Sequence, residues 1–502
     1  MAASLSRLHH ISLHVTNVDK IAYELVSKFK FNLFVARLTE KSKQLAFRKG
    51  AAVFVVNERP LNGVTLSSKR GISPSESEPG WTNNIQTGIK NDKDPKCLYD
   101  VNPHYSVDTA SNVCFEVENV ERSFKSLRNL GCDFLVPPTE VCDEKGIVTY
   151  SVVKSIVGNV NHTLIDTSKY KGSFLPGFQE VENVTENGTP VSNSTDSSCP
   201  VTHFDHITYA CPRRCTPQVM SWYERHFGFH RFFIDSNEDV DEGYVLNTEG
   251  IGLRLTAMEY WKCSQTGIKL PFTDDKQPDC KFVIAESLPD QGVTVLLPSH
   301  SSPLPGLEPG TLCTHRQLTP TKHLSRHKIR GPCRAKGKQL LQGRNQVDTF
   351  LEQHGGPGIQ HIGLYTQDIV STAQTMGRAG VHFFSPPPAY YTEVGKQQEM
   401  EDAGYDPQML SQHSILLDTD LRQVQTDPSC QTTDTQKKRY LLQAFTKPIF
   451  SEDTFFLELI ERRGASGFGE GNIQALWRSV QAYMDTERAE TEAQGENTTH
   501  RT

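Results

Sequence analysis

The sequence predicts an α+β fold in which four βαβββ modules form two domains, each an open barrel of strands with outer helices. Two observations predict it. Short runs with alternating apolar residues, typical of strands, precede amphipathic helical stretches, and this arrangement recurs four times along the chain. A single module of this kind leaves an apolar face uncovered, whereas paired modules can close a half-barrel of strands around a pocket.

The four modules begin at similar strands. Their first strands are expected at HHISLHV (9–15), NVCFEV (112–117), FDHITYA (204–210) and QHIGLYT (360–366). A polar stretch separates the second module from the third, so we expect an N-terminal domain at 1–179, a linker at 180–201, a C-terminal domain at 202–485 and a disordered tail at 486–502.

Three segments do not fit the modules and are expected to be insertions, at 61–109, 292–344 and 421–438. The middle one is basic, with Glu308 as its only acid, and contains no Phe, Trp or Tyr. Binding of single-stranded nucleic acid normally uses aromatic side chains beside the positive charge. A surface insertion is therefore the favoured interpretation, and no nucleic-acid partner is expected.

The composition is that of an ordinary globular protein. The chain has 502 residues, 36% hydrophobic content and a net charge of -7, which gives no global basic field for nucleic acid. No apolar run reaches the length of a membrane-spanning helix, so no transmembrane segment is expected. The twelve cysteines show no paired CxxC spacing. This usage favours reduced thiols over a disulfide framework or a cysteine-based zinc site.

One carboxylate stands in an unexpected place. Glu458 lies in the apolar run FFLELI, where strand alternation places it on one face with Phe456 and Ile460. A carboxylate buried without a partner costs several kcal/mol. Aligning the first strands of the modules places His10, Asn112, His206 and His361 at equivalent positions, which supplies candidate partners.

Two histidines and a carboxylate form the ligand set of non-heme Fe(II) oxygenases, so His206, His361 and Glu458 are the predicted metal ligands. A lone strand histidine is more often a hydrogen-bonded core residue, but the equivalent positions favour a site. The same donors could hold zinc, although the HExxH signature of zinc hydrolases is absent from the chain. The N-terminal modules pair His10 with Asn112 and carry Thr163 or Leu164 on the closing strand, which predicts a metal-free copy.

Five longer stretches resemble the 4-hydroxyphenylpyruvate dioxygenases: YKGSFLPGF, DHIT, GGPGIQHIGLYT, YLLQAFTKP and FFLELIERRGASGFGEGN. The resemblance spans nearly the whole chain apart from the insertions and the tail. It implies a vicinal oxygen chelate (glyoxalase/bleomycin-resistance-like) fold with one Fe(II) per chain, bound by the three predicted ligands. It also implies an aromatic 2-oxo acid and O₂ as substrates and oxidative decarboxylation as the reaction; a homo-oligomer is left open.

The resemblance carries further pocket positions onto this chain. The expected substrate contacts are Gln346, Gln360, Gln443, Phe445, Phe468 and Asn472. Phe445 and Phe468 could equally be ordinary core residues. The stretch after Asn472 is amphipathic through Ile473, Leu476, Trp477, Val480 and Met484, and in the family such a helix closes over the iron; core packing explains the same stripe.

The sequence departs from the family at three pocket positions. Ile473 stands where ring-hydroxylating members carry phenylalanine, and Leu253 and Ala285 replace a serine and an asparagine. A smaller side chain at 473 should let the substrate ring tilt and bring its CH₂ nearer to the oxidant. We therefore expect 4-hydroxymandelate as product, and the resemblance implies that it is made for ubiquinone synthesis in mitochondria. Homogentisate formation and a non-catalytic binding protein are the alternatives, and a cytoplasmic location is the alternative to the mitochondrial one.

Overall fold

A computed structural model describes residues 3–39, 42–59, 97–181, 199–234, 238–248, 251–260, 281–288, 345–420, 439–465, 467–469, 471–476 and 478. The predicted insertions at 292–344 and 421–438, the tail at 486–502 and most of the linker lie outside these residues. Met1–Pro289 and Gly343–Thr502 form one compact unit. None of the helices that the structure describes is long and apolar enough to cross a membrane.

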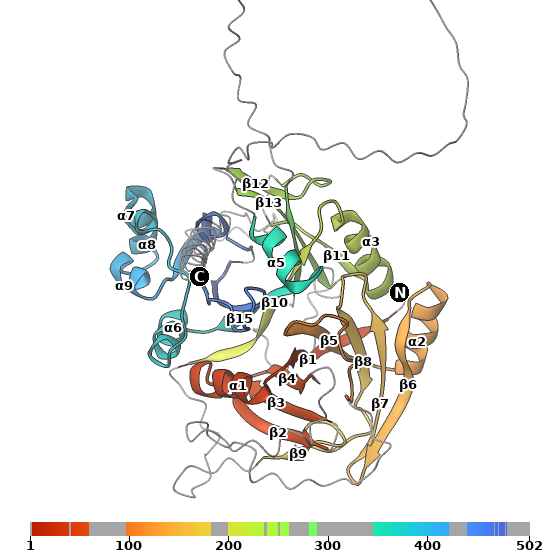
Figure 1. Ribbon diagram of the computed structural model, residues 1–502. Helices are drawn as coiled ribbons and strands as arrows, with labels where there is room; N and C mark the ends of the chain where they lie inside the picture. The colour runs from red at the N-terminus through yellow and green to blue at the C-terminus, as the bar shows by residue number, and fades with distance from the viewer. Residues whose placement is uncertain are drawn as a thin grey trace, which may run out of the picture. The chain divides into compact units, whose positions relative to one another are not determined.

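The N-terminal half contains two βαβββ modules (Figure 1). The first comprises β1 (Leu5–Val15), α1 (Val18–Tyr23), a π-helix (Glu24–Lys28), β2 (Asn32–Leu38), β3 (Lys43–Lys49) and β4 (Ala52–Glu58). The second comprises β5 (Thr109–Val117), α2 (Val120–Asn129), β6 (Phe134–Asp143), β7 (Gly146–Lys154) and β8 (Asn161–Asp166), and the short β9 (Gln179–Glu180) follows.

The C-terminal half repeats this plan with additions. Its first module comprises β10 (Val201–Cys211), α3 (Thr216–Phe227), β11 (Phe229–Phe232), β12 (Tyr244–Thr248), β13 (Ile251–Tyr260) and β14 (Lys281–Ser287). After α5 (Gln346–His354), the second comprises β15 (Gly358–Thr366), α6 (Ile369–Arg378), β16 (Leu416–Asp420), β17 (Arg439–Phe445) and β18 (Phe456–Arg463). Three short helices, α7 (Pro388–Thr392), α8 (Val394–Asp402) and α9 (Pro407–Gln412), lie between α6 and β16.

Each half forms one sheet whose two modules meet at their first strands. The strand order is β6-β7-β8-β5-β1-β4-β3-β2-β9 in the first sheet and β11-β13-β14-β10-β15-β18-β17-β16 in the second, with β12 paired to β13. The central pairs β1·β5 and β10·β15 are antiparallel, and each sheet also contains parallel pairs. This confirms the predicted fold of four modules in two half-barrels.

The turn after the first strand is built alike in three modules. The side chains of Asn17, Asn119 and Asp368 each accept a hydrogen bond from the backbone N–H three residues later and so start α1, α2 and α6. In the remaining module, α3 begins with proline near its N-terminus and ends at Gly228, whose φ of 73° suits glycine. Local sequence thus fixes where each strand gives way to its helix.

The end of the predicted insertion at 61–109 packs into the N-terminal half. Leu98, Tyr99 and Asp100 are buried, and the Tyr99 hydroxyl donates to the carbonyl of Pro176 at 3.0 Å. Asp100 lies 2.8 Å from Nε2 of His14 on β1. Residues 97–108 therefore belong to the interior of this half, which the sequence prediction missed because the segment lacks strand or helix periodicity.

Candidate metal centre and substrate cavity

The three predicted metal ligands converge in the C-terminal half. His206 on β10, His361 on β15 and Glu458 on β18 come from neighbouring strands at the centre of the sheet. Nε2 of His206 lies 3.0 Å from Oε2 of Glu458, and Nε2 of His361 lies 3.7 Å from the same oxygen. His206 and His361 precede Glu458 by 252 and 97 residues in the sequence, yet the three side chains meet around one point, as the module alignment predicts.

The buried carboxylate has the partners that the sequence required. Glu458 is 1% exposed, and its Oε1 accepts a hydrogen bond from Nε2 of Gln443 at 2.8 Å. Burial alone lowers the pKa of His206, but the charge of Glu458 and the hydrogen bonds that the protonated ring donates to Asp205 and Glu458 outweigh it and raise the pKa to about 9. Burial and the neighbouring His206 lower the pKa of His361. The pair of acidic groups therefore attracts a positive charge to this point, whether a proton or a metal ion.

Asp205 orients the first histidine. Nδ1 of His206 lies 3.0 Å from Oδ1 of Asp205, which places the ring proton on Nδ1 and leaves Nε2 free to bind a metal. Arg462 contacts both carboxylate oxygens of Asp205 at 2.7 Å. Burial opposes the charge on Asp205, but the Arg462 guanidinium outweighs it and holds the pKa of this carboxyl well below its usual range. The arrangement is the carboxylate–histidine pair typical of metal sites.

A glycine makes room for the His206 ring. Gly363 of β15 pairs with His206 on one side and with Glu458 on the other. A Cβ atom at this position would lie 2.5 Å from both Nδ1 and Cε1 of His206. The imidazole therefore occupies the space that a side chain at 363 would fill, and it crosses this space to reach Glu458.

The N-terminal half shows the same register with different residues. His10 pairs with Cys114, and Asn112 and Thr163 stand where the other half has His361 and Glu458. Nδ2 of Asn112 donates to Oγ1 of Thr163 at 2.8 Å, so two uncharged side chains satisfy each other there. Of the two closing positions left open by the sequence, Thr163 rather than Leu164 is the equivalent one. Cys114 occupies the position of the space-making glycine.

The metal centre opens into a cavity with about 500 Å³ of empty space, including the solvent at its mouth. Such a size accommodates a small aromatic acid. Six of the residues predicted at the site other than the metal ligands line it: Gln346, Gln360, Gln443, Phe445, Phe468 and Ile473. Gln443 and Phe445 are two residues apart on β17 and therefore both face the cavity, since alternate side chains of a strand point to the same face. The remaining lining is mostly apolar and includes Leu255, Val283, Ala285, Phe456 and Leu476.

Two predicted positions do not line the cavity. Asn472 lies behind the wall, where its Nδ2 donates to Oε1 of Gln443 at 2.9 Å and its Oδ1 accepts from the Tyr390 hydroxyl at 2.8 Å. Leu253 is buried opposite Ser287, two residues earlier on β13, and Leu255, opposite Ala285, takes the cavity position. Residues 471–476 are helical, so Ile473 and Leu476 reach the cavity from one helix turn. Trp477, Val480 and Met484 have side chains outside the described part of the chain.

Several residues that shape the site were not predicted from the sequence. Thr208 lines the cavity, is 1% exposed, and its hydroxyl finds no hydrogen-bond partner among the residues that the structure describes. Phe456 stacks on His361 with ring centroids 4.7 Å apart, and Phe468 contacts His206 edge-on at 5.2 Å. Asp205 belongs to the DHIT stretch, one of the five that resemble the family. A glycine inside a strand often indicates the close approach of another group, so Gly363 could have been predicted to matter.

The donor set and its spacing fit a divalent metal ion. Two ligands about 2.1 Å from one ion lie about 3.0 to 3.4 Å apart at angles of 90–110°. The separation of 3.0 Å between His206 and Glu458 matches this, and the 3.7 Å separation of His361 is slightly longer. The other polar groups of the lining are neutral amides and one hydroxyl. The protein thus offers two imidazoles and one carboxylate on one side and leaves the other side open to the cavity.

Comparison with known proteins agrees with the fold and the site. No protein-family model matches the chain. The chain is 35% identical over 483 residues to the 4-hydroxyphenylpyruvate dioxygenase-like protein of Rattus norvegicus, covering 96% of this chain and 98% of that protein. It is 26% identical to 4-hydroxyphenylpyruvate dioxygenase of Tetrahymena thermophila over 94% of this chain and 88% of that one. A solved structure of a 4-hydroxymandelate synthase mutant from Streptomyces coelicolor matches with a TM-score of 0.59 at 18% identity, covering 96% and 99% of the two chains.

The fold therefore defines a two-domain protein of the vicinal oxygen chelate class, with a candidate metal centre in its C-terminal half. Within this class, the chain belongs to the family of the 4-hydroxyphenylpyruvate dioxygenase-like proteins.

Proposed function

We propose that this protein is an Fe(II)-dependent dioxygenase that converts 4-hydroxyphenylpyruvate and O₂ into 4-hydroxymandelate and CO₂. The observation that carries the choice of product is Ile473, an aliphatic side chain in the cavity wall beside a complete set of metal ligands. The substrate loses its carboxyl group as CO₂; one oxygen atom of O₂ enters the new carboxylate and the other the benzylic carbon. Homogentisate has the same atoms with the hydroxyl on the ring, so substrate orientation alone distinguishes the two products.

Each part of the cavity has a role in this reaction. His206, His361 and Glu458 would hold Fe(II), and the bound metal would supply the redox chemistry between the 2-oxo acid and O₂. The amides of Gln346, Gln360 and Gln443 lie around the cavity and can hydrogen-bond the phenol or the carboxylate. The apolar wall excludes water, which strengthens these polar contacts.

The amide of Gln443 is itself held in place. It donates to Glu458, accepts from Asn472, and Asn472 in turn accepts from the Tyr390 hydroxyl. This chain of hydrogen bonds fixes the orientation of the amide before substrate binds, so its remaining N–H has a defined direction. A fixed donor of this kind positions substrate with little loss of conformational entropy on binding.

The proposed regiochemistry predicts the effect of a larger side chain at 473. Ile473→Phe should shift the product from 4-hydroxymandelate toward homogentisate, because a ring at this position fills the space into which the substrate ring would tilt. Displacements of about 1 Å can change rates about a hundredfold, so a change of several-fold or more in the product ratio is expected. Chromatography against both standards measures the ratio. Leu255→Phe adds a ring elsewhere in the same cavity wall and controls for bulk alone.

Replacing Thr208 is expected to raise the stability of the free enzyme and to lower its affinity for substrate. Thr208→Val keeps the shape but removes a buried hydroxyl with no described partner, so the free enzyme should gain about 0.5–1 kcal/mol of stability. Because the hydroxyl faces the cavity, substrate affinity should fall about tenfold. Thermal unfolding and substrate titration measure the two effects. The control is Thr256→Val on β13: this threonine is equally buried, has no hydrogen-bond partner within the described ranges and does not line the cavity, so the change should raise stability only.

The decisive experiment for the proposed function is a product assay. The chain is loaded with Fe(II) without oxygen, 4-hydroxyphenylpyruvate and O₂ are added, and the products are separated. 4-Hydroxymandelate as main product supports the proposal, and homogentisate would contradict its regiochemistry. Ala285 lines the cavity where the resemblance implies a polar asparagine, and this loss favours a non-catalytic binding protein as the second candidate; iron binding without CO₂ release would establish it.

We further propose that the product supplies the ring of ubiquinone and that the enzyme acts in mitochondria, with the cytoplasm as the alternative. The first strand begins at Leu5, so Arg7 and its neighbours belong to the folded sheet. Cell fractionation followed by detection of the intact chain tests this location.

A further inference from the structure

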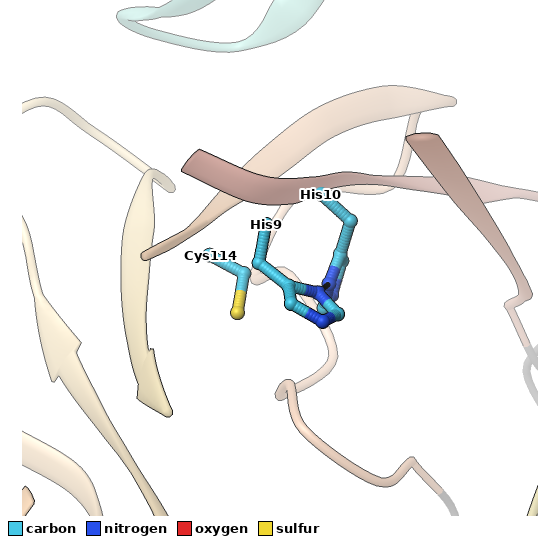
Figure 2. Close-up of side chains that lie close together, drawn as sticks. All are labelled: His9, His10 and Cys114. Carbon is cyan, nitrogen blue, oxygen red and sulfur yellow. Dashed lines mark hydrogen bonds between the residues drawn. The ribbon is translucent and has the colours of Figure 1, made fainter. Parts of the chain in front are cut away.

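We propose that the N-terminal half holds a second metal site, in which His9, His10 and Cys114 bind a zinc-class transition-metal ion. The ligand atoms of these three side chains all lie within 4.8 Å of one another. Figure 2 shows the two imidazoles in contact, with the Cys114 sulfur on the same side of the strands. The inference replaces the prediction of a metal-free N-terminal copy and does not depend on the proposed dioxygenase function.

An irregularity in β1 brings the two histidines to one side. Successive side chains of a regular strand point to opposite faces. Between Leu8 and His10, however, β1 advances two residues while its partner β5 advances one, from Phe115 to Cys114. His9 is therefore the extra residue of a bulge. As a result, Nδ1 of His9 lies 2.7 Å from Nδ1 of His10, although the residues are adjacent in sequence.

The same bulge exists in the C-terminal half, with different side chains. There β10 advances from Phe204 to His206 against one step of β15, so Asp205 is the extra residue and contacts Nδ1 of His206. In the N-terminal half, histidine takes the place of this aspartate. Cysteine takes the place of Gly363. His9 and Cys114, the two neighbours of His10 that differ from the C-terminal half, thus both carry side chains that bind transition metals.

The protonation states suit metal binding by the imidazoles. Burial, followed by the charges of Arg7 and Arg48, lowers the pKa of His9 to about 3. Burial and His9 hold the pKa of His10 well below its usual range. Both rings are therefore neutral, and no proton has to leave an imidazolium before a metal binds. Burial raises the pKa of the Cys114 thiol, so a cation is needed to stabilise its thiolate.

Modest rearrangement would create a coordination site. Two nitrogens about 2.05 Å from a tetrahedral ion lie about 3.3 Å apart, so the rings must separate by roughly 0.6 Å. Two imidazoles and one thiolate favour zinc-class ions over Mg²⁺ or Ca²⁺, which prefer oxygen ligands.

A neighbouring cluster in the same half does not offer comparable donors. His14, Cys97 and Asp100 also lie close together, but Nε2 of His14 and both carboxylate oxygens of Asp100 already have partners. Nε2 of His14 is 2.8 Å from Asp100, whose other carboxylate oxygen accepts from Nδ2 of Asn112 at 2.6 Å. A metal there would have to break these buried hydrogen bonds. Cys97 therefore provides a matched control for Cys114.

Cobalt titration of the full-length chain tests the second site. Co²⁺ replaces Zn²⁺ in such sites, and a bound thiolate gives a sulfur-to-cobalt charge-transfer band in the near ultraviolet. The proposed iron centre has no cysteine ligand and cannot give this band. We expect one equivalent of Co²⁺ to produce the band, Zn²⁺ to remove it, and Cys114→Ser to abolish it.

The controls separate this site from the rest of the chain. His206→Ala should lose Co²⁺ at the C-terminal centre and keep the thiolate band, and Cys97→Ser should keep both. Absence of the band in the wild type, or its persistence in Cys114→Ser, would overturn the proposal. If Cys114→Ser does not fold, His9→Asn at the site's partly exposed ring gives the same test, with an expected fall in Co²⁺ affinity of at least about 100-fold, beyond the 10–100-fold typical of losing an outer partner.

Discussion

Glu458→Gln is expected to abolish iron binding at the candidate centre and turnover with it. The substitution keeps the size of the side chain but removes the only negative charge among the three ligands, so the site loses its attraction for a cation. Loss of an outer partner of a metal site typically costs 10–100-fold in affinity, and loss of a ligand should exceed about 100-fold. Iron content after dialysis and CO₂ release from substrate measure the effect. Wild-type iron content in this variant would contradict the assignment.

Glu461→Gln is the matched control for this experiment. Glu461 lies on the same strand, is 4% exposed, and accepts hydrogen bonds from the backbone N–H of Ile369 at 2.9 Å and from Arg463 at 2.8 Å. It does not line the cavity. This variant should lose some stability because a buried charged hydrogen bond becomes neutral, but its iron content should remain that of the wild type. The comparison separates metal binding from the general cost of altering a buried carboxylate.

The repeat in the sequence was sufficient to predict the fold and the meeting of the three ligands. Each histidine lies near the start of its module, and the modules pair at their first strands, so equivalent positions had to face one another. Glu458 was predicted from a different principle, the cost of an unpaired buried charge. The two lines of reasoning are independent, and both lead to the point where the structure brings the three side chains together.

Details that depend on strand register could not be read from the sequence. Leu253 and Leu255 both alternate correctly with Ala285, and only the observed pairing of Leu255 with Ala285 places one of them in the cavity. The bulge that turns His9 beside His10 is invisible to alternation, which assumes one residue per step. Asn472 was expected to touch substrate, but its amide is occupied by Gln443. Side-chain partners of this kind are set by tertiary contacts.

Gly363→Ala is expected to disrupt the metal centre although it replaces none of the three predicted metal ligands. The added methyl would lie 2.5 Å from two atoms of the His206 ring, so the imidazole must rotate and its Nε2 must leave Glu458. Iron affinity should fall about 100-fold, comparable to a displacement of about 1 Å in a catalytic group. The fold should tolerate the change at a cost of about 1–3 kcal/mol, as is typical of overpacking. Iron titration and thermal unfolding measure both quantities.

Gly377→Ala is a control for the replacement of a glycine, and the N-terminal half already has a larger residue at the position equivalent to Gly363. A Cβ at Gly377 in α6 meets nothing within 4 Å, so Gly377→Ala should leave iron affinity unchanged and stabilise the helix by up to about 1 kcal/mol. In the N-terminal half, Cys114 already occupies the position of Gly363, and His10 there contacts His9 instead of reaching toward Thr163. If Gly363→Ala bound iron as tightly as the wild type, steric room for His206 could not explain why the two halves differ. The absence of a side chain at position 363 would then not determine where the metal binds.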